Sequence, residues 1–313
     1  MRHIIRGHPF ALERVAQTSI DISVVIPSYK HPQKIARCIN SLLNQETTFS
    51  YEIIVVDSSP ADMQSQVAAV CAIDNRINLI QLTEQTYPGA ARNVGIQRAK
   101  GAIIGLIDAD CEALPGWLTT IGNRTRKGFI LTGVIENGTP ESIYGTCSFL
   151  VEFNHFLDIA SDDEELTGAA TCNFACHRDV FEEIGYFTDD RAFEDILLCS
   201  KFINSGGKVL KTNDLRIKHN NKTDRAGVAT NLEMLGKYSA LVRKREGMPP
   251  KLVFSFPPLA FGLIVFRHLS ITTRALRSSY ALQFLLYTPW ILYFLFCWTL
   301  GFYRGAVLGK RDC

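Results

Sequence analysis

The sequence lacks a surplus of charge of either sign. Its 313 residues carry 33 lysines and arginines against 31 aspartates and glutamates. Domains that bind nucleic acid usually concentrate basic charge, so this balance gives no general case for binding DNA or RNA. The length allows one large domain or two ordinary ones, with enough chain for a substantial core.

The sequence also lacks paired cysteines. Nine are scattered along the chain, at positions 38, 71, 111, 147, 172, 176, 199, 297 and 313, and no Cys-x-x-Cys pair occurs. An odd number without framework spacing favours free thiols in a reducing compartment. Cys172 and Cys176 are four residues apart, but a zinc site would need further ligands, so we expect buried thiols. Residues 1–17 have no long apolar core, so we do not expect a secretory signal.

What the sequence does contain is an alternation of strand-like and helix-like segments. Four apolar runs of strand length occur, at 22–26, 52–56, 77–80 and 103–107. Helical patterns lie between them, at about 33–45, 62–71 and 90–100. This alternation indicates βαβ units and an α/β fold with a mostly parallel sheet. Beyond residue 135 the pattern is less regular, and we expect helices at about 149–159 and 191–204 and short strands at 208–210 and 215–217.

Two carboxylates follow the fourth apolar run. Asp108 and Asp110 come directly after Ile103–Ile107, one residue apart. Open α/β sheets bind ligands where the chain leaves the carboxyl ends of their strands. Mg²⁺ and Mn²⁺ prefer oxygen ligands and reach proteins through one or two carboxylates plus substrate phosphates. The pair therefore suggests a metal-diphosphate site, although Asp-x-Asp alone is a weak signal because Asp is common in turns.

Five short motifs occur in order between residues 20 and 220. They are Val-Val-Ile-Pro-Ser-Tyr at 24–29, Val-Val-Asp-Ser-Ser at 55–59, Gly-Ala-Ala-Arg-Asn-Val-Gly-Ile at 89–96, Asp-Ala-Asp at 108–110 and Phe-Glu-Asp at 193–195. Their order and spacing resemble family 2 glycosyltransferases of the GT-A fold. The resemblance implies a Rossmann-like domain that binds a nucleotide sugar, a divalent cation (Mn²⁺ or Mg²⁺), and an inverting displacement at the anomeric carbon.

The resemblance assigns the first three motifs to the donor. It puts the loop of Pro27, Ser28 and Tyr29 against the nucleotide base. Asp57 ends the second strand, where it would accept hydrogen bonds from the base or ribose; the alternative is a helix N-cap. Arg92 and Asn93 lie near the start of a helix, whose N-terminus favours anionic groups, and the match puts Arg92 near the donor. The alternative for Arg92 is a surface side chain without a specific contact.

The remaining motifs supply metal ligands and a base. Asp108 would contact the ribose or the metal, and Asp110 would ligate the metal that bridges both phosphates. His219 follows the last expected strand, where a histidine can complete metal coordination in related enzymes, so His219 is a further candidate ligand. The alternative is that His219 is a surface histidine. Asp195 resembles the family's catalytic base, which must lie within hydrogen-bond reach of the acceptor hydroxyl. Its alternative role is to complement a helix N-terminus. Acceptor-side contacts would come from Glu194, Gly168, Ala169 and Asn173.

The end of the chain changes character. We divide the sequence into an extension (1–20), a GT-A domain (21–220), a basic helical neck (221–251) and a membrane-associated tail (252–313). Residues 281–303 carry no formal charge, and as a helix they would span roughly 35 Å, enough to cross a bilayer. Residues 252–266 are also uncharged but would span only roughly 22 Å, which suits a re-entrant or interfacial segment or a strained first span of a hairpin. The alternative is that both are core helices.

These observations predict an inverting, metal-dependent glycosyltransferase at the cytoplasmic face of a membrane. It would use a UDP- or GDP-sugar and a lipid-linked or glycan acceptor; a homo-oligomer stays open. The Gln-x-x-Arg-Trp motif of processive members is absent after Asp195, which favours transfer of a single sugar. Two alternatives remain: an inactive nucleotide-binding membrane scaffold, and a sugar nucleotidyltransferase. The second usually has a glycine-rich basic loop after its first strand, and residues 27–32 are not such a loop.

Overall fold

The first half of the fold is built from parallel strands that are apolar on both faces. The computed structural model describes residues 20–159 and 163–307. The four predicted strands are confirmed as β1 (Ile22–Ser28), β2 (Tyr51–Asp57), β3 (Ile77–Gln81) and β4 (Ile103–Leu106). They pair in parallel in the order β3-β2-β1-β4. Every residue of β2 is buried, as expected for a strand covered by helices on both sides.

The second half of the same sheet is mixed. Its strands are β5 (Cys111–Ala113), β6 (Phe129–Asn137), β7 (Glu164–Leu166), β8 (Phe174–His177) and β9 (Lys208–His219). Within the described residues they extend the sheet to nine strands, through β4-β8-β6-β9-β5, with β7 also on β9. The two short strands expected at 208–210 and 215–217 are one continuous strand, β9. Its register against β6 shifts after Gly133, where a Cβ atom would lie 1.8 Å from the Leu215 carbonyl oxygen.

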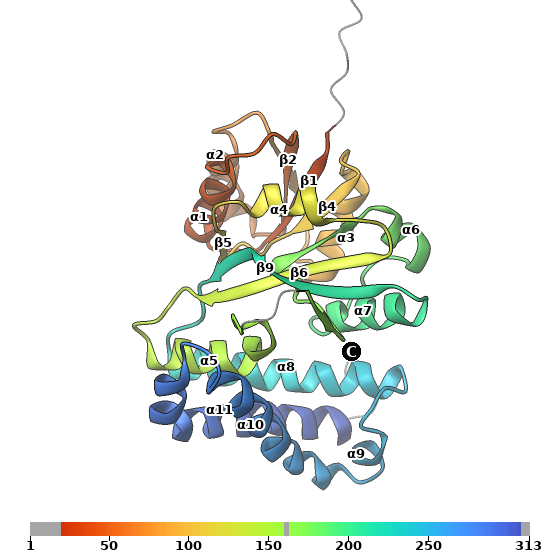
Figure 1. Ribbon diagram of the computed structural model, residues 1–313. Helices are drawn as coiled ribbons and strands as arrows, with labels where there is room; N and C mark the ends of the chain where they lie inside the picture. The colour runs from red at the N-terminus through yellow and green to blue at the C-terminus, as the bar shows by residue number, and fades with distance from the viewer. Residues whose placement is uncertain (1–19, 160–162, 308–313) are drawn as a thin grey trace, which may run out of the picture.

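Helices cover both faces of the sheet (Figure 1). The helical segments before residue 205 are α1 (Pro32–Leu43), α2 (Ala61–Cys71), α3 (Pro88–Arg98), α4 (Trp117–Arg124), α5 (Ile143–Phe153), η1 (Asn154–Phe156), η2 (Thr171–Asn173), α6 (Asp179–Ile184) and α7 (Glu194–Asn204). Gly95 lets α3 lie directly on β1, because a Cβ there would be 2.4 Å from Val25 Cγ1. This contact holds the start of α3 beside the carboxyl ends of the strands.

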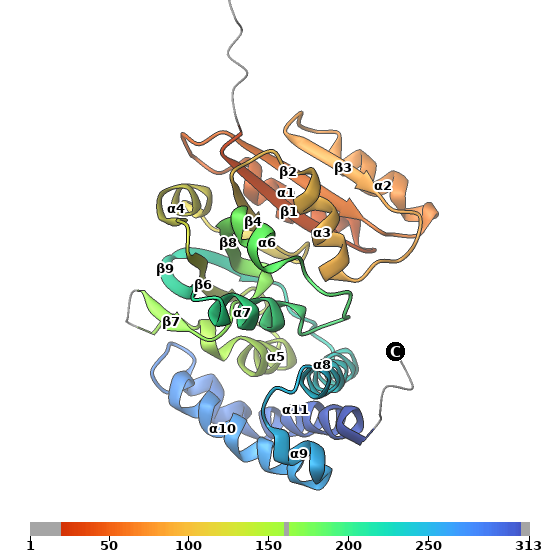
Figure 2. The ribbon, with the colours of Figure 1, turned by 90° about the vertical axis from the view of Figure 1, so that its right-hand side faces the viewer.

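The remaining helices form a layer at the end of the molecule farthest from β1–β3 (Figure 2). They are α8 (Arg225–Arg245), α9 (Lys251–Ser255), η3 (Pro257–Phe261), α10 (Gly262–Ala275) and α11 (Ala281–Val307). Three glycines bring α8 and α11 together: Cβ atoms at Gly236, Gly301 and Gly305 would lie 1.9, 1.9 and 2.4 Å from backbone oxygens of the other helix. One cluster of buried side chains continues from the sheet into both helices.

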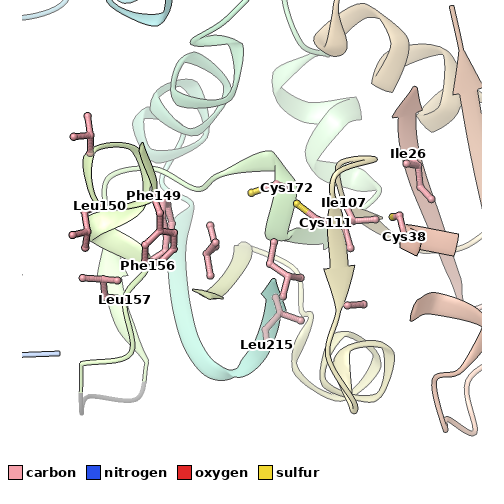
Figure 3. Packing of buried hydrophobic residues seen from close by; sticks show 14 of the residues in the cluster. Ile26, Cys38, Ile107, Cys111, Phe149, Leu150, Phe156, Leu157, Cys172 and Leu215 are labelled. Atoms are coloured by element: carbon pink, nitrogen blue, oxygen red, sulfur yellow. The ribbon is translucent and has the colours of Figure 1, made fainter. Parts of the chain in front are cut away.

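The cysteines lie in this core. Figure 3 shows Cys38, Cys111 and Cys172 among aliphatic side chains such as Ile26 and Ile107. Of the described cysteines, seven are buried, Cys297 is half-buried, and all are free thiols, which confirms the expected buried thiols. Burial raises the pKa of Cys38 and Cys111 well above the ordinary thiol value. These thiols therefore stay protonated and unreactive at neutral pH.

Candidate active site

A cavity opens at the carboxyl ends of the parallel strands. Its volume is about 340 Å³, and loops after β1 and β4 and the start of α3 form most of its wall. Of the predicted donor residues, it is lined by Pro27, Ser28, Tyr29, Arg92, Asp108 and Asp110. The parallel register explains this gathering, because it brings the ends of β1, β2 and β4 to one edge.

Asp57 lies behind this wall. The β1–β2 register sets it opposite Ser28, and its Oδ1 accepts a hydrogen bond of 2.7 Å from Ser59 Oγ. Its Oδ2 and the Ser28 hydroxyl are both buried, and neither has a hydrogen-bond partner among the described residues. Buried polar atoms without partners are rare, and a bound water, ion or ligand is one explanation for them. The N-cap alternative for Asp57 is wrong, because α2 begins at Ala61 with Pro60 at its N-cap.

Arg92 is the centre of a buried ion-pair network. Its side chain is only 2% exposed; Nη2 lies 2.6 Å from Asp108 Oδ1 and Nη1 lies 2.8 Å from Glu194 Oε1. Burial lowers the pKa of Arg92, but the two carboxylates outweigh it and hold the pKa above its usual value. The surface alternative for Arg92 is therefore wrong. The network joins the cavity to the start of α7, where the predicted base lies.

Asp195 sits next to this network at the first turn of α7. Burial, then the neighbouring charge of Glu194, raises the pKa of Asp195 to about 7. Burial also raises the pKa of Glu194, despite its Arg92 partner. The preceding residue, Phe193, adopts a left-handed backbone with φ 75°, and the guanidinium of Arg243 lies 4.6 Å from its ring centre. Strained backbone of this kind occurs where a fold must aim a side chain.

The expected metal ligands meet across two strands. Cys111 of β5 pairs with His219 of β9, and this pairing brings His219 Nε2 to 3.7 Å from Asp110 Oδ1. The amide of Asn221 donates to Asn137 Oδ1, so its Oδ1 accepts from His219 Nδ1 at 2.9 Å. In the neutral form of the imidazole this hydrogen bond leaves the Nε2 lone pair facing Asp110, which is the arrangement that a metal ligand requires. The Cys111 thiol nearby is protonated, so Asp110 and His219 are the side chains of this group that could hold a divalent cation.

Asp110 also has a lysine as a neighbour. Lys34 Nζ, from the first helical turn after β1, lies 3.4 Å from Asp110 Oδ2. Burial raises the pKa of Asp110, but His219 and Lys34 outweigh it, so the pKa lies below its usual value. The carboxylate is ionised at neutral pH and ready to bind a cation.

Eight predicted residues do not line the cavity: Asp57, Glu194, Asp195 and His219, described above, and Asn93, Gly168, Ala169 and Asn173. Asn93 exchanges two hydrogen bonds with the Phe187 backbone and so fixes the loop before α7. Asn173 is fully buried: its amide donates to the Val134 and Leu215 carbonyls and accepts from Trp117. We expected Asn173 at the acceptor, but these partners occupy it within the core.

Gly168 and Ala169 lie against α7. A Cβ at Gly168 would come 2.6 Å from Ile196 Cδ1, and Ala169 donates its backbone N–H to Cys199 Sγ at 3.3 Å. These two residues support the helix that carries Asp195, in addition to any role at the acceptor.

Sequence reasoning missed several side chains of the cavity. Lys30, His31, Lys34, Arg191 and Met234 all line it. Lys30 and His31 adopt left-handed backbone, with φ of 55° and 68°, and this turns the loop after β1 into the cavity. The available signal was the spacing Lys30–Lys34, which puts basic side chains near the end of a strand. Met234 gave no signal, because only the packing of α8 brings it to the site.

A nine-stranded sheet whose parallel end carries an Asp-x-Asp pair beside a nucleotide-sized cavity defines the GT-A class of fold. The chain belongs to glycosyl transferase family 2, whose family model matches residues 23–185, just over half of the chain. Glycosyltransferase AglE of Haloferax volcanii is 33% identical over 173 residues, which are 53% of this chain and 55% of that protein. The succinoglycan biosynthesis protein ExoO of Rhizobium meliloti is 38% identical over 109 residues, 34% of this chain and 29% of that protein. The chain therefore spans about half or less of the length of these relatives.

Solved structures support the same fold. The mannosyltransferase PcManGT of Pyrobaculum calidifontis, in complex with GDP-Man and Mn²⁺, has a TM-score of 0.61 at 17% identity, covering 91% of this chain and 87% of that one. GalNAc-T7 with UDP, GalNAc and Mn²⁺ has a TM-score of 0.54 at 15% identity, covering 74% of this chain and 52% of that one. Both likenesses concern the fold.

Proposed function

We propose that this protein is a metal-dependent, inverting glycosyltransferase that moves one sugar from a UDP- or GDP-sugar to an acceptor hydroxyl. The observation that carries the proposal is the Arg92 network, which joins Asp108 at the cavity to Glu194 beside Asp195. A donor site and a carboxyl group with a pKa of about 7 are thus parts of one rigid unit. A scaffold would have no use for a base tuned in this way, so the transferase is favoured over the inactive alternative.

The donor would lie in the cavity after β1 and β4. Asp57 Oδ2 and the Ser28 hydroxyl supply unpartnered polar atoms for the nucleotide's base, and the ion pair with Arg92 would hold Asp108 toward the ribose. Asp110 and His219 would hold Mn²⁺ or Mg²⁺, which neutralises charge on the diphosphate as it leaves. The Mn²⁺ complexes of the two structural neighbours support this choice of cation. Lys34 adds a further positive charge on the phosphate side.

Asp195 acts as the base. Its carboxylate takes the proton of the acceptor hydroxyl while that oxygen attacks the anomeric carbon from the face opposite the diphosphate. The new carbon–oxygen bond forms as the bond to the diphosphate breaks, and its electron pair leaves with the nucleoside diphosphate. A carboxyl with a pKa of about 7 is a stronger base than an ordinary aspartate and is still largely ionised just above neutral pH. Glu194, paired with Arg92, holds the start of α7 in place.

The acceptor we propose is a lipid-linked sugar or another membrane-associated glycan at the cytoplasmic face. An apolar, basic C-terminal region supports this part of the proposal. Within the described residues, one helix, α11, is long and apolar enough to cross a membrane by length and composition.

Calorimetric titration tests the donor site first. We expect wild-type protein to bind either UDP or GDP only with Mn²⁺, and Asp110→Asn to lose that binding while keeping its fold by circular dichroism. Absence of binding by the folded wild-type protein would contradict the proposal and favour the scaffold. With donor and acceptor present, release of free nucleoside diphosphate indicates glycosyl transfer, whereas pyrophosphate would indicate a nucleotidyltransferase.

A further inference from the structure

The C-terminal helical layer, which consists of α9, η3, α10 and α11, exposes an unusual amount of apolar surface. Of nineteen large apolar side chains that are exposed in the described residues, fifteen lie between residues 252 and 307. They include Phe266, 71% exposed, and Leu286, 64% exposed. Soluble monomers rarely expose a contiguous apolar patch of more than a few hundred Å². This surface therefore needs an occupant.

The exposed side chains follow one face of each helix. On α11 exposed residues recur every three or four positions, at Leu282, Leu285, Leu286, Pro289, Leu292, Tyr293 and Phe296. The buried ones, such as Ile291, Leu295, Trp298 and Phe302, follow the opposite face. Packing against the domain explains the inner face of α11 and leaves the equally apolar outer face unexplained. On α10, Val265, Phe266 and Leu269 are exposed in the same way.

The outer faces of different elements join into one surface. Phe261 of η3 is exposed and its ring lies 6.1 Å from that of Phe296, which is exposed on α11. Both views of the ribbon show α9, α10 and α11 at the same end of the molecule, below α5 and α8 (Figures 1 and 2). The patch thus covers one end of the protein.

The charge of the layer identifies the occupant. No aspartate or glutamate occurs from Gly247 to Arg311, whereas Lys251, Arg267, Arg274, Arg277 and Arg304 are basic. Among the described ion pairs, Lys251, Arg274 and Arg277 have no acidic partner. A second copy of this face would bring like charges together. An anionic bilayer instead offers hydrocarbon for the leucines and phenylalanines and phosphates for the basic side chains.

The position of α11 decides how the layer meets the bilayer. Close to its beginning, the Asn137 backbone N–H donates to Tyr280 Oη at 3.3 Å. Near its end, Arg304 pairs with Glu233, and Lys244 Nζ donates to the Ala306 carbonyl at 2.9 Å. Between them, Gly301 and Gly305 bring its backbone against α8. A helix fastened along its whole length to a domain with charged side chains lies along that domain and does not stand out from it.

From these observations we infer that α9, η3, α10 and α11 lie flat in the interface of an anionic membrane, inserted by their outer apolar face and not spanning it. The long apolar helix α11 thereby attaches the catalytic domain to the membrane surface while lying parallel to it. This inference deepens the membrane part of the proposed function but does not depend on transfer activity.

Vesicle flotation of the full-length protein tests the attachment. We expect binding to vesicles of phosphatidylcholine with 30 mol% phosphatidylglycerol, in the range that mixed anionic membranes cover, and at least tenfold weaker binding to phosphatidylcholine alone. The triple variant Phe266→Ser, Leu285→Ser, Leu286→Ser should lose binding, while Ile73→Ser, an equally exposed apolar residue outside the layer, should keep it. Lys251→Gln with Arg277→Gln should weaken only the response to anionic lipid.

Tryptophan depth measurements separate a flat helix from a spanning one. Leu282→Trp and Phe296→Trp, each in a Trp290→Phe background, put probes on the outer face about 21 Å apart along the axis. The signal of Trp290→Phe alone, which keeps Trp117 and Trp298, is measured separately and subtracted. A flat helix predicts equal, shallow quenching of both by brominated lipids. One deep and one shallow probe would show that α11 spans the bilayer and would overturn the inference.

Two further outcomes are decisive. A wild-type protein that ignores all vesicles but forms a dimer, which the triple variant abolishes, would assign the face to a second copy and refute the membrane role. The inference and the proposed function fail separately: Asp195→Asn should still bind vesicles, and the triple variant should still bind nucleotide with Mn²⁺. Nucleotide binding also verifies that each variant is folded.

Discussion

At Asp195, burial and the charge of the neighbouring Glu194 together raise the pKa of the carboxyl group to about 7. The base form exists above the pKa, so kcat/KM should be constant above about pH 8 and fall roughly tenfold per pH unit below about pH 6. Asp195→Asn should lower kcat by roughly 10²- to 10⁴-fold and keep donor affinity. Steady-state rates from pH 5 to 9 and calorimetry measure both. A rate independent of pH in that range would remove Asp195 from the role of base.

The same carboxyl should destabilise the fold in its ionised form. Its pKa is raised in the folded state, so the unfolded chain loses this proton at lower pH, and the free energy of unfolding falls as pH rises from about 4 to about 7. Asp195→Asn should therefore raise the melting temperature more at pH 8 than at pH 4. Scanning calorimetry at the two pH values measures the difference. An equal shift at both would mean that the charge of Asp195 costs the fold nothing.

Arg92 satisfies two carboxylates at once, which a lysine cannot do. The ammonium of Arg92→Lys would reach Asp108 or Glu194 but lacks the fork that holds both, and each lost charged hydrogen bond costs about 1.5–3 kcal/mol. We expect a lower melting temperature and weaker donor binding. Arg98→Lys, an exposed arginine on the same helix, is the matched control and should change neither. Equal behaviour of the two variants would show that the network is dispensable.

Residue types alone predicted part of the cavity wall and missed the rest for physical reasons. Asp108 and Asp110 line the cavity because one strand end delivers both. His219 lies next to Asp110 only because it pairs with Cys111 across β5 and β9. No local sequence pattern encodes this pairing. Asn173 was misassigned because an amide in a stretch of small residues resembles a sugar contact, whereas three core partners occupy it.

Among the elements, periodicity predicted the parallel strands and their helices, because each is local and apolar. The middle of the sheet was harder. β6 (Phe129–Asn137) was not predicted, since Thr132, Gly133 and Glu136 interrupt its apolar pattern; its neighbours β8 and β9 stabilise it through long-range pairing. Likewise, a basic helical neck was expected at 221–251, where α8 lies, but the packing of its inner face against α11 was not predicted. Helix-to-helix contacts of this kind depend on partners fifty or more residues away.

The α8–α11 contact makes its own prediction. A methyl group at Gly236 would lie 1.9 Å from the Trp298 carbonyl oxygen, which belongs to backbone and cannot rotate away. Gly236→Ala should therefore cost about 1–3 kcal/mol or more through overpacking. Gly262→Ala is the control: no atom lies within 4 Å of its Cβ position, so better helix propensity should leave stability unchanged or up to about 1 kcal/mol higher. Chemical denaturation measures both, and a stable Gly236→Ala would mean that the helices separate readily.

At the scale of the whole molecule, the C-terminal helices pack against the domain with their inner face and expose an apolar outer face. An anchor that could be removed without loss of stability would lack the first of these contacts. Phe294 on the inner face of α11 is fully buried in the cluster that continues into the sheet, whereas Leu286 on the outer face is 64% exposed. Phe294→Ala should lower the free energy of unfolding by about 3–5 kcal/mol, whereas Leu286→Ser should change it by no more than about 0.5 kcal/mol in detergent-free buffer.

A chain ending at Gly247 should be insoluble or melt at a much lower temperature, because α8 would lose the partner of its buried face. A truncated chain that melts like the full-length protein would instead make residues 248–313 an independent appendage. The predicted result means that the membrane-attached helices and the catalytic domain share a single hydrophobic core. A substitution on the outer face should then change membrane binding alone. A substitution on the inner face should also disturb the cavity, because α8 carries Met234 into its wall.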